Sequence, residues 1–222
     1  MSNEQDKDRP ALIFYSRIWS KYLKMGPVLE FGCGVGHFIR RIAQNEMTYA
    51  LEINEYARSQ VTINSPSTTL LKSIDQLKED TIGSIVSLHV LEHINDEELI
   101  EIGISFNRIL KSNGRILITV PNLSGKAHLL KLSEWSGFSD ITHINLKTSE
   151  QWRTFFETKW GVSVIAEYAD GFYDFPYEKG LLNILIKDGF RLLLTVVQFL
   201  SSCLFIKKDY GENVIFLLEK SK

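Results

Sequence analysis

The sequence predicts an α/β protein built on a doubly wound parallel sheet with helices on both faces. Short apolar segments rich in β-branched residues alternate with amphipathic segments through residue 120. The stretch VLEFGCGVGHF, residues 28–38, places three glycines directly after the first apolar segment and before a helix. No internal repeat or Pro/Gly/Ser-rich linker divides the chain. We therefore expect a single domain over residues 1–222.

The first half of the chain is expected to alternate helix and strand. Residues 11–24 space aromatic and aliphatic side chains as an amphipathic helix does. A short buried strand follows, and Gly36 opens the next helix. Glu52 lies near the end of the second strand. The expected strands are 27–32, 48–54 and 67–73, and the helices between them are 36–45 and 55–64.

The second half continues this alternation and then departs from it. A β-branched strand at 82–90 precedes a long helix at 96–111, with Asp96 as its N-cap and Asn113–Gly114 as its stop. Thr148 and Ser149, ahead of Glu150 and Gln151, mark a later helix start. The remaining expected elements are strands at 115–122, 161–171 and 213–220, with a helix at 148–160.

Composition excludes several classes of function. The 222 residues are 44% hydrophobic and 23% charged, with a net charge of −2 and no basic block, so we expect no nucleic-acid partner. Cys33 and Cys203 are far apart and show no CxxC or Cys/His spacing. This argues against a disulfide scaffold or a structural zinc site, and no metal site is expected. The polar N-terminus lacks the apolar core of a signal peptide, which favours a cytoplasmic protein.

One apolar segment qualifies the expected location. Residues 192–206 carry only small polar side chains among apolar ones, and Arg191 and Lys207 flank them. The segment is shorter than the roughly 20 residues that span a bilayer as a helix. It is expected to lie in an interface or to pack as a buried helix.

The glycine stretch could be a plain turn, a nucleotide cradle or a close packing contact. The plain turn would be a tight strand-to-helix turn without a ligand. A dinucleotide site would be one kind of cradle, but His37 stands where the third glycine of GxGxxG should be. A P-loop is excluded because no Gly-Lys-Ser/Thr follows. The pattern is instead ExGxGxG, with Glu30 on the strand itself.

These residues resemble motif I of the class I S-adenosylmethionine-dependent methyltransferases. The similarity extends to ALEIN, SLHVLEHIND and RILKSNGRILITVPN, which together cover roughly residues 20–125. DITHINLKTSEQWRTFF, residues 140–156, further resembles the small-molecule branch. The resemblance implies a Rossmann-like, seven-stranded sheet, mostly parallel with an antiparallel last strand. It also implies the cofactor S-adenosylmethionine.

The resemblance implies a set of cofactor contacts. Glu52 would accept both ribose hydroxyls, and the glycines would pass beside the methionine moiety. Glu30 would orient the loop and meet the ligand's ammonium, while Cys33 would be a small filler. Either Asp75 or Ser73 would meet the adenine amine. The expected cofactor-binding residues are Glu30, Gly32, Cys33, Gly34, Gly36, Glu52, Ile53, Asp75, Leu88 and His89.

Catalysis needs alignment of donor and acceptor, and removal of a proton if the acceptor is a hydroxyl. His143 is the preferred base, with Asp140 placed to orient it, and His89 is the next candidate. His93 is expected to cap and pack the following helix, and a reaction without a protein base stays open. LHVLEH stands where amino-methylating enzymes have an Asn/Asp-Pro-Pro-Tyr motif, which favours a small-molecule, sugar or lipid-like acceptor methylated at oxygen.

The C-terminal part is expected to serve the acceptor. We divide the chain into an N-terminal helix at 1–25, a cofactor-binding core at 26–125 and a substrate-side region at 126–222. Residues 178–208 are expected to form helices over or beside the acceptor site, broken at Asp188–Gly189. Added core, a homodimer surface, a lid and a peripheral membrane contact all stay open for them. The alternatives to an enzyme of this family are a catalytically silent binding module and a nicotinamide oxidoreductase.

Overall fold

The computed structural model describes residues 8–171 and 178–221. Its centre is a sheet of seven strands in the order β3-β2-β1-β4-β5-β7-β6. β7 runs antiparallel to both of its neighbours, β5 and β6, and the other neighbouring pairs are parallel. The predicted fold class is therefore confirmed, including its antiparallel last strand. The strands are β1 (Val28–Phe31), β2 (Thr48–Leu51), β3 (Thr69–Leu71), β4 (Ile82–Leu88), β5 (Leu110–Pro121), β6 (Val162–Ala169) and β7 (Asn213–Lys220).

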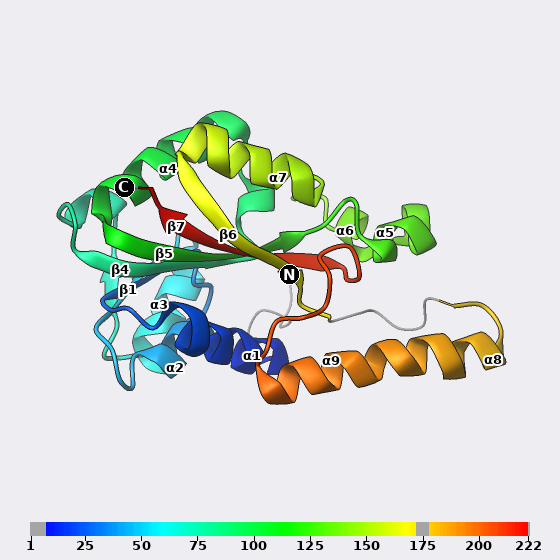
Figure 1. The fold of residues 1–222 in the computed structure, drawn as a ribbon. Coiled ribbons are helices and arrows are strands. Elements are labelled where there is room, and N and C mark those ends of the chain that lie inside the picture. Colours follow the sequence, from blue (N-terminus) through cyan, green and yellow to red (C-terminus); the bar gives the residue numbers. More distant parts are fainter. Residues whose placement is uncertain (1–7, 172–177, 222) are drawn as a thin grey trace.

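Helices cover both faces of this sheet (Figure 1). α4 and α7 lie on one face, and α1, α2 and α3 lie on the other, with α9 beside α1. The helices are α1 (Pro10–Ile18), α2 (His37–Ile42), α3 (Glu55–Asn64), α4 (Asp96–Ile109), α5 (Lys126–Lys131), α6 (Ser136–Ser139), α7 (Ser149–Phe155), α8 (Leu181–Asn183) and α9 (Gly189–Ser201). Wider turns extend α1 to Leu23, α7 to Trp160 and α8 to Asp188.

Two apolar clusters, one on each face, hold these layers together. On the first face Phe106 of α4 and Trp152 of α7 pack on the sheet with Ile116 and Phe216. On the second face α1 and α2 contribute, among others, Phe14 and Phe38. The alternating apolar residues of a central strand thus serve both clusters, which is why β1, β4, β5 and β7 read as nearly continuous apolar runs.

The boundaries of α4 differ from those predicted. Its N-cap is Asn95, whose side chain accepts a hydrogen bond from the Glu98 amide at 2.9 Å, so the choice of Asp96 was wrong. The helix also ends at Ile109, four residues before the expected stop. Leu110 is fully buried and already pairs with Ile82 of β4, and this tertiary pairing draws the chain into β5 early.

The expected break at Asp188–Gly189 is also wrong. Gly189 has helical angles of φ −60° and ψ −40°, and helix continues from Leu181 to Ser201. The Asp188 carboxylate accepts from Arg191 at 2.6 Å and from the Glu178 amide at 3.2 Å. These partners hold an acidic side chain inside a helix that its sequence would otherwise interrupt.

The C-terminal half of α9 is fixed to the sheet by one buried amide. The Gln198 side chain donates to the carbonyls of Ala169 and Asp170 at 3.0 and 2.9 Å, and accepts from the amides of Phe205 and Ile206 at 3.0 Å each. Both N–H groups of the Gln198 side-chain amide are therefore hydrogen-bonded, as expected for a buried polar group. The start of the helix extends away from the sheet (Figure 1).

Candidate functional site

The glycine loop between β1 and α2 lies where the strand order reverses, with β2 on one side of β1 and β4 on the other. Gly32, Gly34 and Gly36 have φ angles of +74°, +51° and +86°, a region that favours glycine. A Cβ atom at Gly32 would lie 2.3 Å from a methyl group of Val90, whereas one at Gly34 would have nothing within 4 Å. The loop therefore has open space directly beside the Gly34 backbone.

Glu52 directly follows β2 and turns its carboxylate toward this loop. One oxygen accepts from the Gly34 amide at 2.9 Å, and the other accepts from the amides of Ile53 and Asn54, both at 2.9 Å. A carboxylate offers about four lone-pair positions, so these bonds leave about one for a ligand. Glu52 thus fixes the loop and keeps some capacity for a polar group in the open space.

Glu30 is a buried carboxyl between β1 and the start of α2. It is 3% exposed, and one of its oxygens accepts from the Ile39 amide at 3.1 Å. Burial raises the pKa of Glu30 well above its usual value, the Ile39 hydrogen bond opposes the rise, and the charge of Glu52 adds to it. A cationic ligand group nearby would favour the ionised carboxylate.

Glu30→Gln is expected to change how the stability of the protein depends on pH. Because the folded-state pKa of Glu30 is raised, its contribution is fully present below the unfolded value near 4.5 and is lost as pH rises through the folded pKa. Between pH 4.5 and the folded-state pKa, the free energy of unfolding of the parent should fall relative to that of the glutamine variant, by at most about 1.4 kcal/mol per pH unit. Urea unfolding at a series of pH values measures this, with Glu101→Gln on the exposed surface of α4 as control. A constant difference across pH would contradict the prediction.

The other predicted cofactor residues lie around the same edge. Cys33 is buried, and burial raises the pKa of its thiol, which suits a space-filling side chain and not a nucleophile. Ile53 is 93% exposed. Asp75 accepts from the Ser73 hydroxyl at 2.9 Å, so the two candidates for the adenine contact are hydrogen-bonded to each other.

Leu88 ends β4, and His89 follows with a φ of +56°. The His89 amide donates to the Thr119 carbonyl at 2.8 Å, which holds this turn against β5. Left-handed backbone is uncommon for residues other than glycine, although histidine adopts it more readily than most. The turn brings the His89 imidazole to the edge of a pocket.

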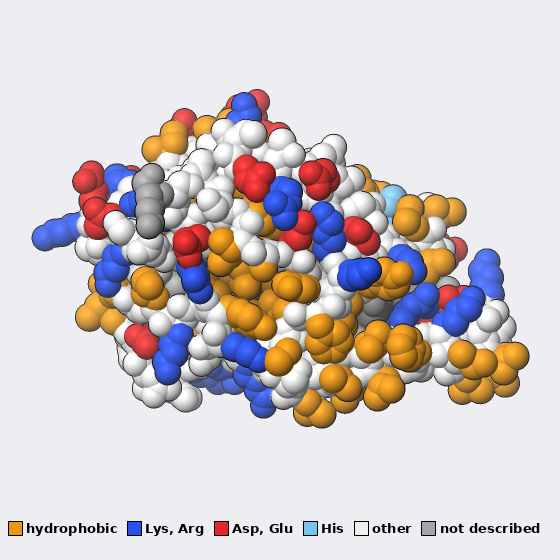
Figure 2. Space-filling view, viewed as in Figure 1, with side chains coloured by type: hydrophobic (Ala, Val, Ile, Leu, Met, Phe, Trp, Pro, Cys, Tyr) orange, Lys and Arg blue, Asp and Glu red, His pale blue; other side chains and the backbone are white. Residues whose placement is uncertain are grey.

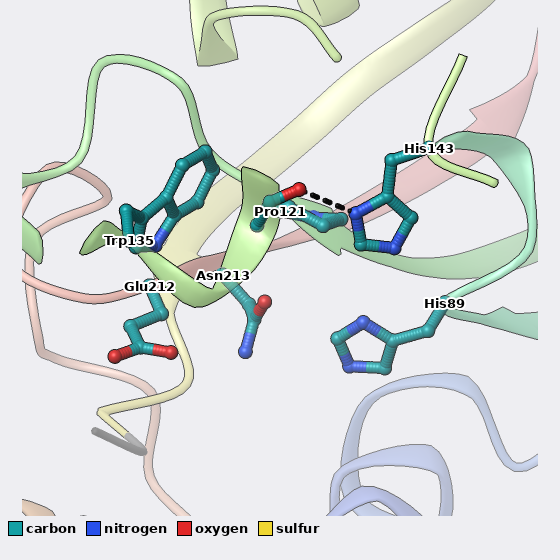
Figure 3. A pocket seen from close by; sticks show the side chains of 7 residues that line it. His89, Pro121, Trp135, His143, Glu212 and Asn213 are labelled. Carbon is teal, nitrogen blue, oxygen red and sulfur yellow. Dashed lines mark hydrogen bonds between the residues drawn. The ribbon is translucent and has the colours of Figure 1, made fainter. Parts of the chain in front are cut away.

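This pocket of about 160 Å³ lies at the carboxyl ends of β4 and β5. Figure 3 shows His89 and His143 on one side of it and Glu212, Asn213 and Trp135 on the other. Because β7 is antiparallel to β5, Asn213 at its start lies beside Pro121 at the end of β5. The pocket is lined by His89, Pro121, Trp135, Gly137, His143, Glu212 and Asn213. Imidazoles, a carboxylate and an amide line it, so it suits a polar group.

His143 is oriented by a backbone carbonyl and not by Asp140. Its Nδ1 lies 2.7 Å from the Gly137 carbonyl oxygen (Figure 3). Its Nε2 lies 3.8 Å from Asp140, too far for a hydrogen bond. A carbonyl only accepts, so the proton is on Nδ1 and the lone pair is on Nε2. Hydrogen bonds from the Thr142 hydroxyl and amide lower the pKa of Asp140, which makes it a poor base.

His93 does not cap α4 as expected. Its Nδ1 lies 3.1 Å from the Thr142 carbonyl and 2.9 Å from the Thr142 hydroxyl, and its ring centroid lies 4.8 Å from that of His143. Asn95 occupies the cap position instead. The fold therefore brings together two histidines that are 50 positions apart in the sequence.

Sequence reasoning missed Trp135, Glu212 and Asn213 as pocket residues. The start of an antiparallel last strand lies at the same edge as the ends of its parallel neighbours, so the expected strand at 213–220 could have placed Asn213 there. Trp135 carries no comparable signal, because its position depends on the connection after β5.

A glycine loop at the switch point of the sheet and an acidic residue after the next strand are typical of α/β proteins that bind a nucleotide-like ligand. A family model described as a methyltransferase domain matches residues 5–165. The chain belongs to this methyltransferase family, and the family expected from the glycine loop is thereby confirmed.

Individual relatives agree with this assignment. A protein of Halobacillus halophilus named as the uncharacterized methyltransferase YrrT is 30% identical over 132 residues, which are 56% of this chain and 59% of that protein. A methyltransferase structure from Archaeoglobus fulgidus, described as SAM dependent, has a TM-score of 0.63 and 19% identity, covering 96% of this chain and 95% of its own. The plantazolicin methyltransferase BpumL, solved with SAH and a substrate analogue, has a TM-score of 0.64 and 16% identity, covering 99% and 88%. At these identities the two structures show a shared fold.

Proposed function

We propose that this protein is an S-adenosylmethionine-dependent methyltransferase that methylates a small-molecule acceptor at oxygen. The observation that carries the proposal is the open space beside Gly34, next to a carboxylate that already holds the loop amide at 2.9 Å. Membership of the methyltransferase family and the shared fold of BpumL support it.

The residues present fit this cofactor. Glu52 would accept ribose hydroxyls with its remaining lone pair and by exchange of a loop amide. Glu30, a buried carboxyl, would neutralise the ammonium of the methionine moiety. The bound cofactor would supply an activated methyl group on a sulfonium. The chain's own work is then to align the acceptor and to accept its proton.

Two imidazoles at the pocket can accept that proton. His143 has its Nε2 lone pair free because Nδ1 donates to Gly137, and His89 lines the same pocket. Both are partly exposed at its edge, His89 by 33% of its side chain. A hydroxyl acceptor in the pocket would lie within reach of either ring, which favours methylation at oxygen.

Turnover tests the proposal. The protein should convert S-adenosylmethionine to S-adenosylhomocysteine with a panel of hydroxylated small molecules, sugars and lipid-like alcohols, and the methylated product should be seen by mass spectrometry. Cofactor binding without turnover across that panel would favour the alternative of a catalytically silent binding module. Product from amines alone would contradict the oxygen target.

We further propose that α8 and α9 contact a membrane surface. Their exposed face is apolar, and it forms a row of hydrophobic side chains along the lower edge in Figure 2. Exposed Lys179 and Lys207 flank these helices in the sequence, as suits an anionic lipid surface, and Lys187 pairs with Glu178 at 3.2 Å. No helix in the described part of the chain is long and apolar enough to cross a membrane. The exposed side chains are Leu181, Leu182, Leu185, Ile186, Phe190, Leu192, Leu193, Val196, Val197 and Leu200.

The double variant Phe190→Ser, Leu193→Ser is expected to lose most binding to vesicles that contain phosphatidylglycerol. The two side chains are 60% and 57% exposed and lie one turn apart, so their loss removes apolar area without a change in the core. Co-sedimentation measures it, with Ile104→Ser on exposed α4 as the matched control. The parent could instead fail to bind vesicles and form a dimer that the double variant converts to monomers. In that case the partner of this face is a second copy of the chain.

A further inference from the structure

Glu92 is the least satisfied charged side chain of the pocket region. It lies in the turn Leu91–His93 after β4 and is 1% exposed. Neither carboxylate oxygen has a hydrogen-bond partner among the described residues, and the nearest ionisable contact is His89 Nδ1 at 3.5 Å. A carboxylate buried this deeply is expected to be paired or to coordinate a metal. Among the described residues only the His89 imidazole is near enough to compensate this carboxylate, and a bound cation would supply the charge that it lacks.

Two histidines beside Glu92 have the protonation that a metal requires. Nδ1 of His93 and Nδ1 of His143 lie 3.1 and 2.7 Å from the carbonyl oxygens of Thr142 and Gly137. A carbonyl only accepts, and the Thr142 hydroxyl, 2.9 Å from Nδ1 of His93, donates its own proton to Asp140 at 2.6 Å. Each ring therefore has its proton on Nδ1 and its lone pair on Nε2. This second contact is the arrangement that orients metal-binding histidines.

The backbone also fixes the two segments that carry these side chains. The Asn145 amide donates to the Glu92 carbonyl at 2.9 Å, and the Asn145 side chain donates to the Ile94 carbonyl at 2.7 Å. The turn after β4 and the segment that holds His143 are thus joined independently of any ligand. The three side chains are held close together by rigid backbone contacts.

We propose that Glu92, His93 and His143 bind one divalent transition-metal ion at the wall of the pocket. One ligand atom from each residue lies within 4.8 Å of those from the other two. Metal bonds of about 2.0–2.2 Å place ligand atoms roughly 3–3.5 Å apart, so the most widely separated side chains must close by up to roughly 1.5 Å. Two imidazoles and a carboxylate favour zinc or a neighbouring first-row ion over Mg²⁺ or Ca²⁺.

This metal site would also select the class of methyl acceptor. This part of the inference rests on the proposed methyltransferase function. Three protein ligands leave a tetrahedral ion with an open position. His143 lines the pocket, so that position is next to the acceptor and selects a molecule with an oxygen that can bind the metal. Nε2 of His143 then serves the ion, and His89 is the imidazole left to accept a proton. No Cys/His spacing in the sequence revealed this set, because the fold alone brings it together.

Titration of the chelator-treated full chain with Zn²⁺ by calorimetry tests the site. The parent should bind one ion, and Glu92→Gln and His143→Gln should each weaken binding by roughly 10–100-fold or more, since even outer-shell changes cost that much. Mg²⁺ should not compete. Glu92→Gln should fold normally because the carboxylate accepts no hydrogen bond from the part of the chain that the structure describes.

His128→Gln is the matched control. Its Nδ1 also lies against a backbone carbonyl, that of Leu123 at 2.7 Å, but it is outside the proposed ligand set. It should bind Zn²⁺ like the parent. No saturable binding by the parent, or equal binding by Glu92→Gln, overturns the site. S-adenosylhomocysteine binding is measured on the same metal-free samples. If the parent binds S-adenosylhomocysteine but not Zn²⁺, the metal site alone is overturned. If the parent does not bind S-adenosylhomocysteine, the proposed function is overturned.

Discussion

Glu52→Ala is expected to weaken S-adenosylhomocysteine binding by about 100-fold, or about 3 kcal/mol, because charge-assisted hydrogen bonds to two ribose hydroxyls are lost. The carboxylate also holds the amides of Gly34, Ile53 and Asn54, so its removal loosens the loop that the cofactor must meet. Isothermal titration calorimetry of the parent and the variant measures the effect.

Two further variants separate the causes. Glu52→Gln keeps an oxygen that can accept from the loop but removes the charge, so its affinity should fall between those of the parent and the alanine variant. Glu55→Ala changes an exposed carboxylate in the first turn of α3 and should leave affinity unchanged. Equal affinities for Glu52→Ala and Glu55→Ala would show that the cofactor does not use Glu52.

Gly34→Ala is expected to lower cofactor affinity by at least about tenfold while the protein stays folded. The residue has a φ of +51°, which costs roughly 1–2 kcal/mol for an L side chain. Apart from Gly34 and its two chain neighbours, no atom of the described residues lies within 4 Å of the added Cβ, so the methyl group would enter the space that the cofactor is proposed to fill. Thermal unfolding and calorimetry measure the two effects separately.

Gly161→Ala is the matched control, because it makes the same substitution far from the glycine loop. Gly161 has a φ of +65°, ends the extended helix α7 and likewise has nothing within 4 Å of an added Cβ. Both variants should lose similar stability, but only Gly34→Ala should lose affinity. If both variants lose affinity equally, or if neither loses any, the result would contradict a ligand beside Gly34.

Local patterns were enough to predict most elements of the sheet. α3 and β7 have the predicted bounds, because strong periodicity and nearby caps or turns define them. The early end of α4 could not be predicted, since it depends on Leu110 pairing with Ile82. The unbroken helix through Asp188 has a different cause, because Arg191, three residues further along the same helix, pairs with the Asp188 carboxylate. A tertiary contact overrode local preference at Leu110, and a local side-chain pair offset it at Asp188.

Part of the candidate site could be predicted from the sequence and part could not. The glycine loop and Glu52 could be predicted together because β1 and β2 are parallel neighbours, so their carboxyl ends meet. The grouping of Glu92, His93 and His143 could not, because the connection between β5 and α7 brings His143 to the turn after β4. Neighbouring ends of parallel strands can be anticipated from a sequence, whereas the path of a long connection cannot.

Calorimetric titration of the full chain with S-adenosylhomocysteine tests the central claim most directly. Binding of one molecule per chain is expected, with an affinity that Glu52→Ala and Gly34→Ala lower and that Glu55→Ala and Gly161→Ala leave unchanged. A folded parent that gives no heat of binding and no ligand-induced rise in melting temperature would contradict the account of the glycine loop as a methyl-donor site.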